Sequence, residues 1–468
     1  MKKTLLLLAA LGLASAAKLT AGTVDVYITG STAFRANVYT ACTKLFASAP
    51  SIYYGNAAHG GAGTLNSKDT SWCMTGTPIT QLTNVYTPGS PSGTTLNIHG
   101  LFTGSIQGLK AVETSQKLVW ALPQGTINNN TTTTYTTNSA TLAFSDSDNA
   151  ACPYIVSGNY EQESVAVQPF VIAKANTANG VTNISNVSWE QMYYGIPNGR
   201  VPLSAWTSHD SDSNNWVYLA ERTLDSGTRR TLTSGDFYQY SDTVGIYIYD
   251  ATNGNGWYSP TQLAPAGLTV GTGLTYGDGT NGVIATGGYG FDGNVNLQWG
   301  YGYVAGGDIK DTLNKTGLDN QSLGCLSMSD SQGVGTSNWA TVVSFDGLWP
   351  TVAGAGIHGN TGTNDYSPIT SGYYPLWGYE VVVHPIDPGA VPPKDQNITL
   401  AQLGDWLTPG TFEGVFNAQT INNGGSPITG SIENEIQLSK TGSPGATAIR
   451  LSDMKSNRTS VGGEIFPF

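Results

Sequence analysis

The chain carries few charged side chains. Only 11% of its 468 residues are charged, and 32 acidic residues outnumber 20 basic ones, which gives a net charge of −12. A protein that binds nucleic acid needs a basic patch to neutralise phosphates, so the composition argues against a nucleic-acid partner. It does not argue against a small anion, because salt screens a distant acidic surface beyond about 10 Å, whereas donors inside a buried site act locally.

Residue patterns for catalysis and for metal binding are also missing. The five histidines are scattered without metal-ligand spacing, and the sequence contains neither a Gly-x-Ser-x-Gly motif nor a phosphate-loop lysine motif. Asp210, Asp212, Asp278 and Asp292 lie in expected loops and could bind Ca²⁺, but solvated loop acids are the more common case. The sequence therefore predicts a protein that is not an enzyme and that uses no cofactor and no metal.

The N-terminal segment and the glycine content indicate an exported, loop-rich protein. The chain has 59 glycines, while 11 tryptophans and 10% aromatic residues exclude disorder as its main state. Residues 1–17 are predicted to be a signal peptide, with two lysines, an apolar run over 4–13 and an Ala-x-Ala site. That run is too short to span a membrane, and no Cys follows it to carry a lipid anchor. A periplasmic or secreted location is expected.

Four segments with small polar residues carry the strongest signal. In chain order they read Gly-Ser-Thr-x-Phe at 30–34, Gly-Ser-x-x-Gly at 104–108, Ser-Asp at 145–146 and Arg-x₃-Ser-Gly-Thr at 222–228. A helix that begins at such a turn presents free N–H groups and hydroxyls to one point, and its dipole adds positive charge there. The guanidinium of Arg222 adds two parallel donors. Each segment alone is equally typical of a simple turn with a helix cap.

The order of these segments resembles the periplasmic phosphate-binding proteins of ABC phosphate importers, a group of type II solute-binding proteins. Three further segments also resemble that family: residues 183–195 together with Trp206, residues 323–330, and residues 374–383. The resemblance implies an α/β fold with two periplasmic-binding-protein-like lobes. Two crossover strands, near 165–173 and 374–383, would join the lobes, and Gly/Asn/Tyr-rich β insertions would decorate them.

Carried over residue by residue, the resemblance implies nine ligand-binding positions. They are Thr32, Ala33, Phe34, Ser105, Asp146, Arg222, Ser226, Gly227 and Thr228. In the family the residue at the position of Asp146 accepts a proton from the anion. A carboxylate gains a hydrogen bond from hydrogen phosphate but meets only repulsion from sulfate, so this residue favours phosphate. Asp148 is a competing candidate for the role.

The sequence departs from the family pattern near two of these positions. Ala33 stands where the family usually has Thr, so a hydroxyl is lost, which Thr32 could replace. Arg35 stands where the family often has Pro, and we expect its side chain to face solvent. Leu224 replaces the family Asp that holds the arginine, and Asp225 lies one place later.

The resemblance also divides the chain. Lobe 1 would comprise residues 23–165 and 380–468, and lobe 2 would comprise residues 166–379. Residues 47–97, rich in Gly, Ser, Thr and Pro, have the composition of an insertion in lobe 1. Residues 251–307 alternate small and aromatic side chains, which favours a β-hairpin elaboration of lobe 2 over disorder.

The cysteine count is even, as suits an oxidising compartment, and four cysteines allow three pairings. The four are Cys42, Cys73, Cys152 and Cys325. A Cys42–Cys73 disulfide would staple the insertion to lobe 1. Cys325 lies in an apolar run, so a buried free thiol is the alternative for it.

Together these features predict a monomeric, exported solute-binding protein that captures an inorganic oxyanion, phosphate first of all, between its lobes. Its partner would be the permease of an ABC transporter. The alternative is a secreted surface or matrix protein that keeps the fold without an import role. The long insertions, the missing lipid anchor and the changes at Ala33 and Leu224 favour that alternative. A secreted hydrolase is a third reading, which lacks any nucleophile–base pair.

Overall fold

The fold is that of a computed structural model. It describes residues 23–55, 71–79, 95–123, 135–147, 160–175, 181–194, 199–222, 226–233, 248–250, 256–258, 297–298, 302–303, 305–314, 321–331, 340–351, 366–387, 394–395, 448–449, 453–458 and 465–467. The predicted signal peptide, Cys152 and Asp148 lie outside these residues.

Three parallel strands and two helices form the centre of lobe 1. β1 (Thr23–Gly30) pairs in parallel with β4 (Thr95–Leu101) on one side and with β7 (Leu142–Ser145) on the other. The connections between these strands contain α2 (Arg35–Thr43) and α4 (Ser105–Glu113), as parallel pairing requires a long crossover. Side chains of α2 and of α4 belong to different apolar clusters, so the two helices cover opposite faces of the sheet.

The described part of the segment 47–97 extends this sheet. β2 (Ser51–Tyr54) and β3 (Ser71–Gly76) continue it beyond β4 as antiparallel strands. Trp72 and Met74 of β3 are fully buried in the core of lobe 1, so these strands are part of the packed fold. A separate antiparallel pair consists of β5 (Lys117–Ala121) and β6 (Tyr135–Ser139).

Lobe 2 repeats the parallel arrangement around β11 (Trp216–Ala220) and β16 (Gln321–Ser327). Between them the chain forms α7 (Gly227–Thr233) and α8 (Gly306–Leu313), and β10 (Arg200–Pro202) pairs antiparallel with β11. The other elements are β9 (Asn183–Ile184), α5 (Asn186–Tyr194), α6 (Ser204–Thr207), the 3-10 helix η2 (Asp210–Asp212), α9 (Met328–Ser331), β17 (Ala340–Phe345) and α10 (Ser367–Thr370).

Two short antiparallel pairs lie in or next to the predicted β elaboration at 251–307. They are β12 (Ile248–Asp250) with β13 (Gly256–Tyr258), and β14 (Leu297–Gln298) with β15 (Gly302–Tyr303). The described residues of this segment therefore include β-hairpin pairs, as the alternation of small and aromatic residues predicts.

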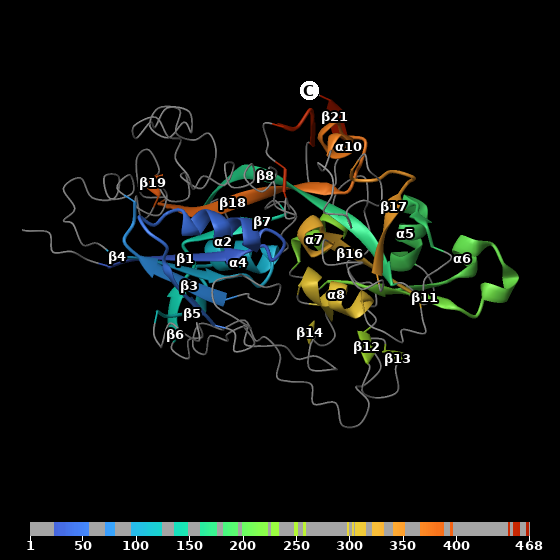
Figure 1. The fold of residues 1–468 in the computed structure, drawn as a ribbon, viewed down its shortest axis with the longest axis horizontal. Helices are drawn as coiled ribbons and strands as arrows, with labels where there is room; N and C mark the ends of the chain where they lie inside the picture. The colour runs from blue at the N-terminus through green and yellow to red at the C-terminus, as the bar shows by residue number, and fades with distance from the viewer. Residues whose placement is uncertain are drawn as a thin grey trace, which may run out of the picture.

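Two long strands run through both lobes (Figure 1). β8 (Tyr160–Ala175) and β18 (Trp377–Asp387) pair antiparallel, with a register shift between Glu380 and Val381. β18 also pairs with β7 of lobe 1, and β8 with β16 and β17 of lobe 2. A single thirteen-stranded sheet of the described residues results, in the order β10-β11-β16-β8-β18-β7-β1-β4-β3-β2, with β9, β17 and β19 (Lys394–Asp395) off this path. The α/β class with two crossing strands is confirmed.

Residues near the C-terminus pack beside the start of β18. The backbone N–H of Lys455 donates to the carbonyl of Thr370 at 2.7 Å, and the Arg458 guanidinium lies 4.6 Å from the centre of the Trp377 ring. β20 (Ser456–Arg458) and β21 (Ile465–Pro467) pair with each other here. This segment falls in the range 380–468 that the sequence assigns to lobe 1, yet these contacts lie at the lobe 2 end of β18. The division into lobes remains a prediction.

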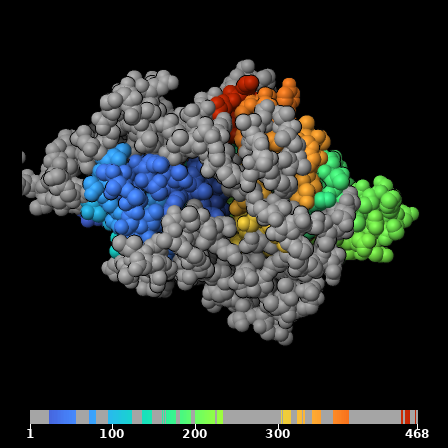
Figure 2. Space-filling model, viewed as in Figure 1, coloured from blue at the N-terminus to red at the C-terminus, as the bar shows by residue number. Residues whose placement is uncertain are grey.

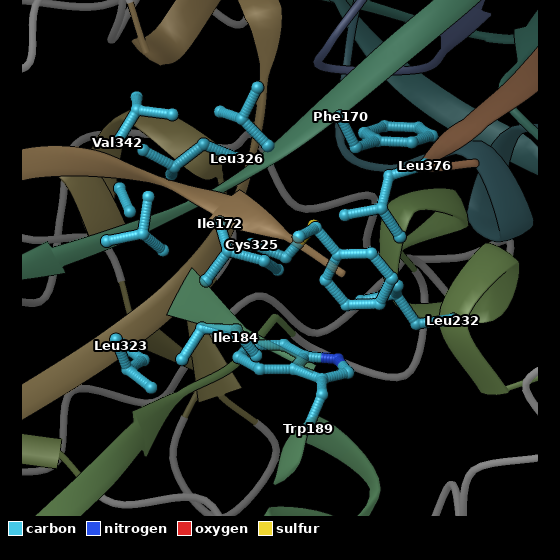
Figure 3. Packing of buried hydrophobic residues seen from close by; sticks show 14 of the residues in the cluster. Phe170, Ile172, Ile184, Trp189, Leu232, Leu323, Cys325, Leu326, Val342 and Leu376 are labelled. Atoms are coloured by element: carbon cyan, nitrogen blue, oxygen red, sulfur yellow. The ribbon is translucent and has the colours of Figure 1, made fainter. Parts of the chain in front are cut away.

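The apolar core follows the two halves of the sheet. One cluster belongs to lobe 2, and two smaller clusters lie on opposite faces of the lobe 1 sheet. Figure 2 shows the blue residues of lobe 1 at one end of the molecule and green residues of lobe 2 at the other. Cys325 lies within the lobe 2 cluster, near Ile172 and Leu376 (Figure 3).

The predicted Cys42–Cys73 disulfide is wrong. Cys42, Cys73 and Cys325 are all buried free thiols. Cys42 of α2 packs in the same cluster as Trp72 and Met74, which flank Cys73 in β3. Because neighbouring side chains in a strand point to opposite faces, Cys73 points away from α2. For Cys325 the alternative of a buried free thiol is correct.

Candidate functional site

The four polar segments meet where the parallel strands of both lobes end. The Ser31–Phe34 turn follows β1, Ser105 follows β4, Asp146 follows β7, and Arg222 follows β11. Ligands of open α/β sheets bind outside the carboxyl ends of the strands, so this is where such a fold places a site. In Figure 1, α7 lies on the side of lobe 2 that faces lobe 1.

Asp146 is the centre of this arrangement, and its side chain is buried. Its Oδ1 accepts a hydrogen bond from the Ser105 hydroxyl, and its Oδ2 accepts one from Thr228 Oγ1 at 3.2 Å. The carbonyl oxygen of Asp146 accepts a bond from Thr231 Oγ1, also at 3.2 Å. One carboxylate therefore joins hydroxyls from α4 of lobe 1 and α7 of lobe 2.

Gly227 packs directly on this carboxylate. A Cβ atom at position 227 would lie 1.7 Å from Asp146 Oδ1 and 2.7 Å from Ser105 Cβ. The carbonyl oxygen of Gly227 accepts a hydrogen bond from Ser147 Oγ at 3.0 Å. Only glycine fits at this position, which gives a physical reason for the Ser-Gly-Thr sequence.

Burial and hydrogen bonds act in opposite directions on the Asp146 carboxyl. Burial is the largest effect and raises the pKa of Asp146 above its ordinary value, because it disfavours the charged form. The Ser105 hydroxyl, the positive charge of Arg222 and the Thr228 hydroxyl each lower this pKa in part. The hydroxyls and Arg222 therefore offset only part of the cost of burying the charged Asp146 carboxylate.

Arg222 is buried and connects the two lobes. Its Nη2 donates to Thr32 Oγ1 at 3.0 Å, and its Nε donates to the carbonyl oxygen of Tyr303 at 3.3 Å. Leu224, which replaces the family Asp that holds the arginine, lies outside the described residues, and so does Asp225. The contact to Tyr303 shows that another part of the chain orients the guanidinium.

A second group of buried side chains supports Arg222, and the sequence reading missed it. The Glu221 carboxylate accepts hydrogen bonds from the Arg222 backbone N–H, at 2.6 Å, and from the Tyr193 hydroxyl. The Tyr303 N–H donates to the Glu221 carbonyl at 3.0 Å, and Arg229 Nη1 donates to the Arg222 carbonyl at 2.9 Å. The only signal in the sequence was an acidic residue, Glu221, directly after an apolar strand.

The first segment forms a tight buried turn. Gly30 has a φ of 119°, and a Cβ there would lie 1.9 Å from the carbonyl oxygen of Phe144. The Phe34 N–H donates to Ser31 Oγ at 3.2 Å, and Ala33 and Phe34 are both buried. Arg35 is also buried and its Nη1 donates to the Thr32 carbonyl at 3.1 Å, so the expectation that Arg35 faces solvent is wrong.

The structure thus brings the nine predicted positions into one region, although their contacts differ. Asp146, Ser105, Gly227 and Thr228 contact one another directly, and Arg222 contacts Thr32. The Ser226 hydroxyl instead accepts the Arg229 N–H at 3.3 Å and so caps α7.

The described part of the chain shows no metal cluster among its acidic, cysteine and histidine side chains. Of the aspartates considered for Ca²⁺, Asp212 accepts a hydrogen bond from Thr207 at 2.6 Å, whereas Asp278 and Asp292 lie outside the described residues. Among the described helices, none is long and apolar enough to cross a membrane.

Comparison with known proteins gives weak similarities. No protein-family model matches the chain, and no curated protein matches it. Among solved structures, it is similar to a Clostridium perfringens protein with bound phosphate that is assigned to phosphate ABC transport as a substrate-binding protein. That similarity has 11% identity and a TM-score of 0.39 over 92% of this chain and 100% of the other.

Two further similar structures are phosphate-binding proteins. One is a high-affinity periplasmic phosphate-binding protein (PfluDING) with bound phosphate, at 12% identity and a TM-score of 0.36 over 92% of this chain and 91% of that one. The other is a phosphate-binding protein from Stenotrophomonas maltophilia, at 13% identity and a TM-score of 0.31 over 78% and 79%.

Proposed function

We propose that this protein binds an inorganic oxyanion, phosphate above all, between its two lobes and acts as an exported solute-binding protein for an ABC importer. The observation that supports this most is the contact between Asp146, Ser105, Gly227 and Thr228. Hydroxyls from two lobes converge on one buried carboxylate, and a guanidinium lies close enough to affect its charge.

The donors of this region suit a tetrahedral anion. The hydroxyls of Ser105, Thr228 and Thr32 can each turn toward an anion oxygen, and the Arg222 guanidinium can donate through two parallel N–H groups. Neutral donors supply most of the bonds, so the cost of desolvating a pure ion pair is reduced. Because the donors come from both lobes, binding would draw the lobes together around the anion.

Asp146 would select among oxyanions. With an anion at the site, the hydroxyls that now bond to Asp146 would turn to the anion. The Asp146 carboxylate would then accept a hydrogen bond from a protonated oxygen of the anion. Hydrogen phosphate carries such a proton and fully ionised sulfate does not. The expected preference is therefore for phosphate, and for arsenate by the same chemistry.

The decisive experiment is calorimetric titration of the mature protein with phosphate, arsenate, sulfate and molybdate. We expect heat from phosphate and arsenate, weaker binding of sulfate, and loss of the phosphate heat in Gly227→Ala, where a methyl group would fill the space beside Asp146. If none of the four anions binds, the alternative of a surface or matrix protein that keeps only the fold replaces this proposal. Growth on limiting phosphate after deletion of the gene for this protein would test the import role separately.

A further inference from the structure

A second carboxyl group lies beside the candidate site. Glu380 is on β18, the strand that crosses between the lobes, and its side chain is fully buried (0% exposed). Within the part of the chain that the structure describes, neither of its carboxyl oxygens has a partner at full hydrogen-bond geometry, although the Ser31 hydroxyl lies nearby. A buried ionised carboxylate without partners is strongly disfavoured, so this group calls for an explanation.

The position of Glu380 directs its side chain toward Asp146. Residues two apart in a strand share a face, so Glu380 and Gly378 point to the same side of β18. A Cβ at Gly378 would lie 3.2 Å from the Asp146 carbonyl oxygen and 3.5 Å from Thr231 Oγ1. The register of β18 against β8 shifts directly after Glu380, and such irregularities often re-aim a side chain next to a functional site.

The surroundings of Glu380 favour its neutral form. Burial is the largest effect and raises the pKa of Glu380 well above its usual range; the charge of Asp146 raises it further, and the nearby Ser31 hydroxyl lowers it. Among the described residues, two uncharged polar side chains lie beside Gly378 on the same face of the sheet: Thr231 on α7, and Gln168 on β8, which pairs opposite Gly378. The positive charge of Arg222 lowers the pKa of Asp146.

We propose that Glu380 is a second acidic residue of the oxyanion site, which holds a proton while the anion is bound and so limits the pH range in which the site binds. This inference rests on the proposed function. With Glu380 neutral, the negative charges at the site are those of Asp146 and the anion, opposed by Arg222. Ionisation of Glu380 would add a further negative charge beside Asp146 in a dry environment, where repulsion is strong.

The sign of the pH dependence follows. A bound anion favours protonated Glu380, so above the pKa of Glu380 in the free protein each binding event takes up a proton. The phosphate affinity of the wild type then falls by up to about tenfold per pH unit relative to a variant that stays neutral. Glu380→Gln is that variant, because glutamine has nearly the same shape and no acid proton.

The test is calorimetric titration with inorganic phosphate from acid to alkaline pH on three proteins: the wild type, Glu380→Gln and Glu190→Gln. Glu190 is an exposed residue of α5, so its substitution makes the same chemical change away from the site. The ionisation of phosphate itself changes with pH in the same way for all three proteins. It therefore cancels in the ratio of two affinities, and that ratio reports only the ionisation of the protein. We expect the ratio of Glu380→Gln to wild type to rise with pH and that of Glu190→Gln to stay flat.

A second measurement does not depend on the ligand, and its wild-type arm does not depend on the variant being folded. Infrared spectra of the wild type with ¹³C-labelled glutamate should show the carbonyl band of a protonated glutamic acid at neutral pH, and Glu380→Gln should lack it. No such band in the wild type, or a flat affinity ratio for Glu380→Gln, overturns the inference while the proposed function stands. If the wild type binds no oxyanion, the proposed function fails and this inference with it.

Discussion

Replacing Gly227 with alanine tests the central contact of the site most directly. The new methyl carbon would lie 1.7 Å from Asp146 Oδ1, half of the 3.4 Å at which ordinary contact begins. Asp146 cannot easily turn aside, because both of its carboxylate oxygens and its backbone carbonyl are hydrogen-bonded. We therefore expect α7 to move away from the end of β7.

The cost can be worked out from the bonds that this movement would break. They are the bond from Thr228 to the Asp146 carboxylate, the bond from Thr231 to the Asp146 carbonyl, and the bond from Ser147 to the Gly227 carbonyl. A bond to a charged group contributes about 1.5–3 kcal/mol and a neutral one about 1 kcal/mol. The expected loss in the free energy of unfolding is about 3–5 kcal/mol.

Urea unfolding of the wild type and of Gly227→Ala measures this loss, and Gly76→Ala in β3 is the matched control. A Cβ at Gly76 would lie 3.1 Å from Phe46 Cδ1, the far part of a side chain that can shift, so we expect a change within about 1 kcal/mol. Equal stability and equal phosphate affinity of the two variants would refute the direct packing of Gly227 on Asp146.

Three further predictions follow from charged side chains. Arg222→Ala should weaken phosphate binding by about 2–4 kcal/mol in calorimetry, since a buried charge-assisted contact is lost; a change under about 0.5 kcal/mol would place Arg222 outside the site. Asp146→Asn should reduce the preference for phosphate over sulfate by a few kcal/mol in competition binding, because an amide can also donate; a wild type that binds both anions equally would contradict this. Asp25 accepts a hydrogen bond from His99 at 3.1 Å, which lowers the pKa of Asp25. Its stabilising effect is therefore present above the pKa of an unfolded Asp and lost as pH falls through the lowered value, so the melting temperatures of wild type and Asp25→Asn should converge in acid.

The parts of the site that the sequence predicts are those with local causes. A small-residue turn that opens a helix is written in consecutive residues, so Ser105 and the Ser226–Thr228 segment could be placed at helix starts. That these starts meet at one carboxylate, Asp146, depended on the order of the segments along the chain. The sequence could not say how the hydroxyls would be arranged around that carboxylate.

The errors concern the direction in which a side chain points. The sequence places Arg35 in solvent, yet the turn before α2 folds its guanidinium back onto a backbone carbonyl. Cys42 and Cys73 were paired because of their place in the sequence, but a strand alternates its faces and Cys73 lies on the wrong one. A shift of one residue in strand register moves a side chain from one face of the sheet to the other. Amino-acid composition does not determine that register.

The residues that were missed act over long separations in sequence. Tyr303 orients Arg222 from a segment 81 residues away, and Glu380 reaches the site from the last crossing strand. One signal was available: Glu380 interrupts an apolar strand, Tyr379 to Val383, with a single acid. An isolated charge inside such a run is either an exposed position or a functional group, and burial distinguishes the two.

The place of β18 in the sheet has a consequence for how the chain folds. β18 lies between β7 and β8, but it follows them by more than 200 residues, as in the pair Phe144 and Val382. Until β18 has been synthesised, the edge of β7 and the first half of β8 have no partner, and such open edges invite pairing with other chains. Contacts between residues so distant in sequence form slowly. We expect the joining of the two half-sheets by β18 to be the late step of folding, and the step most prone to aggregation.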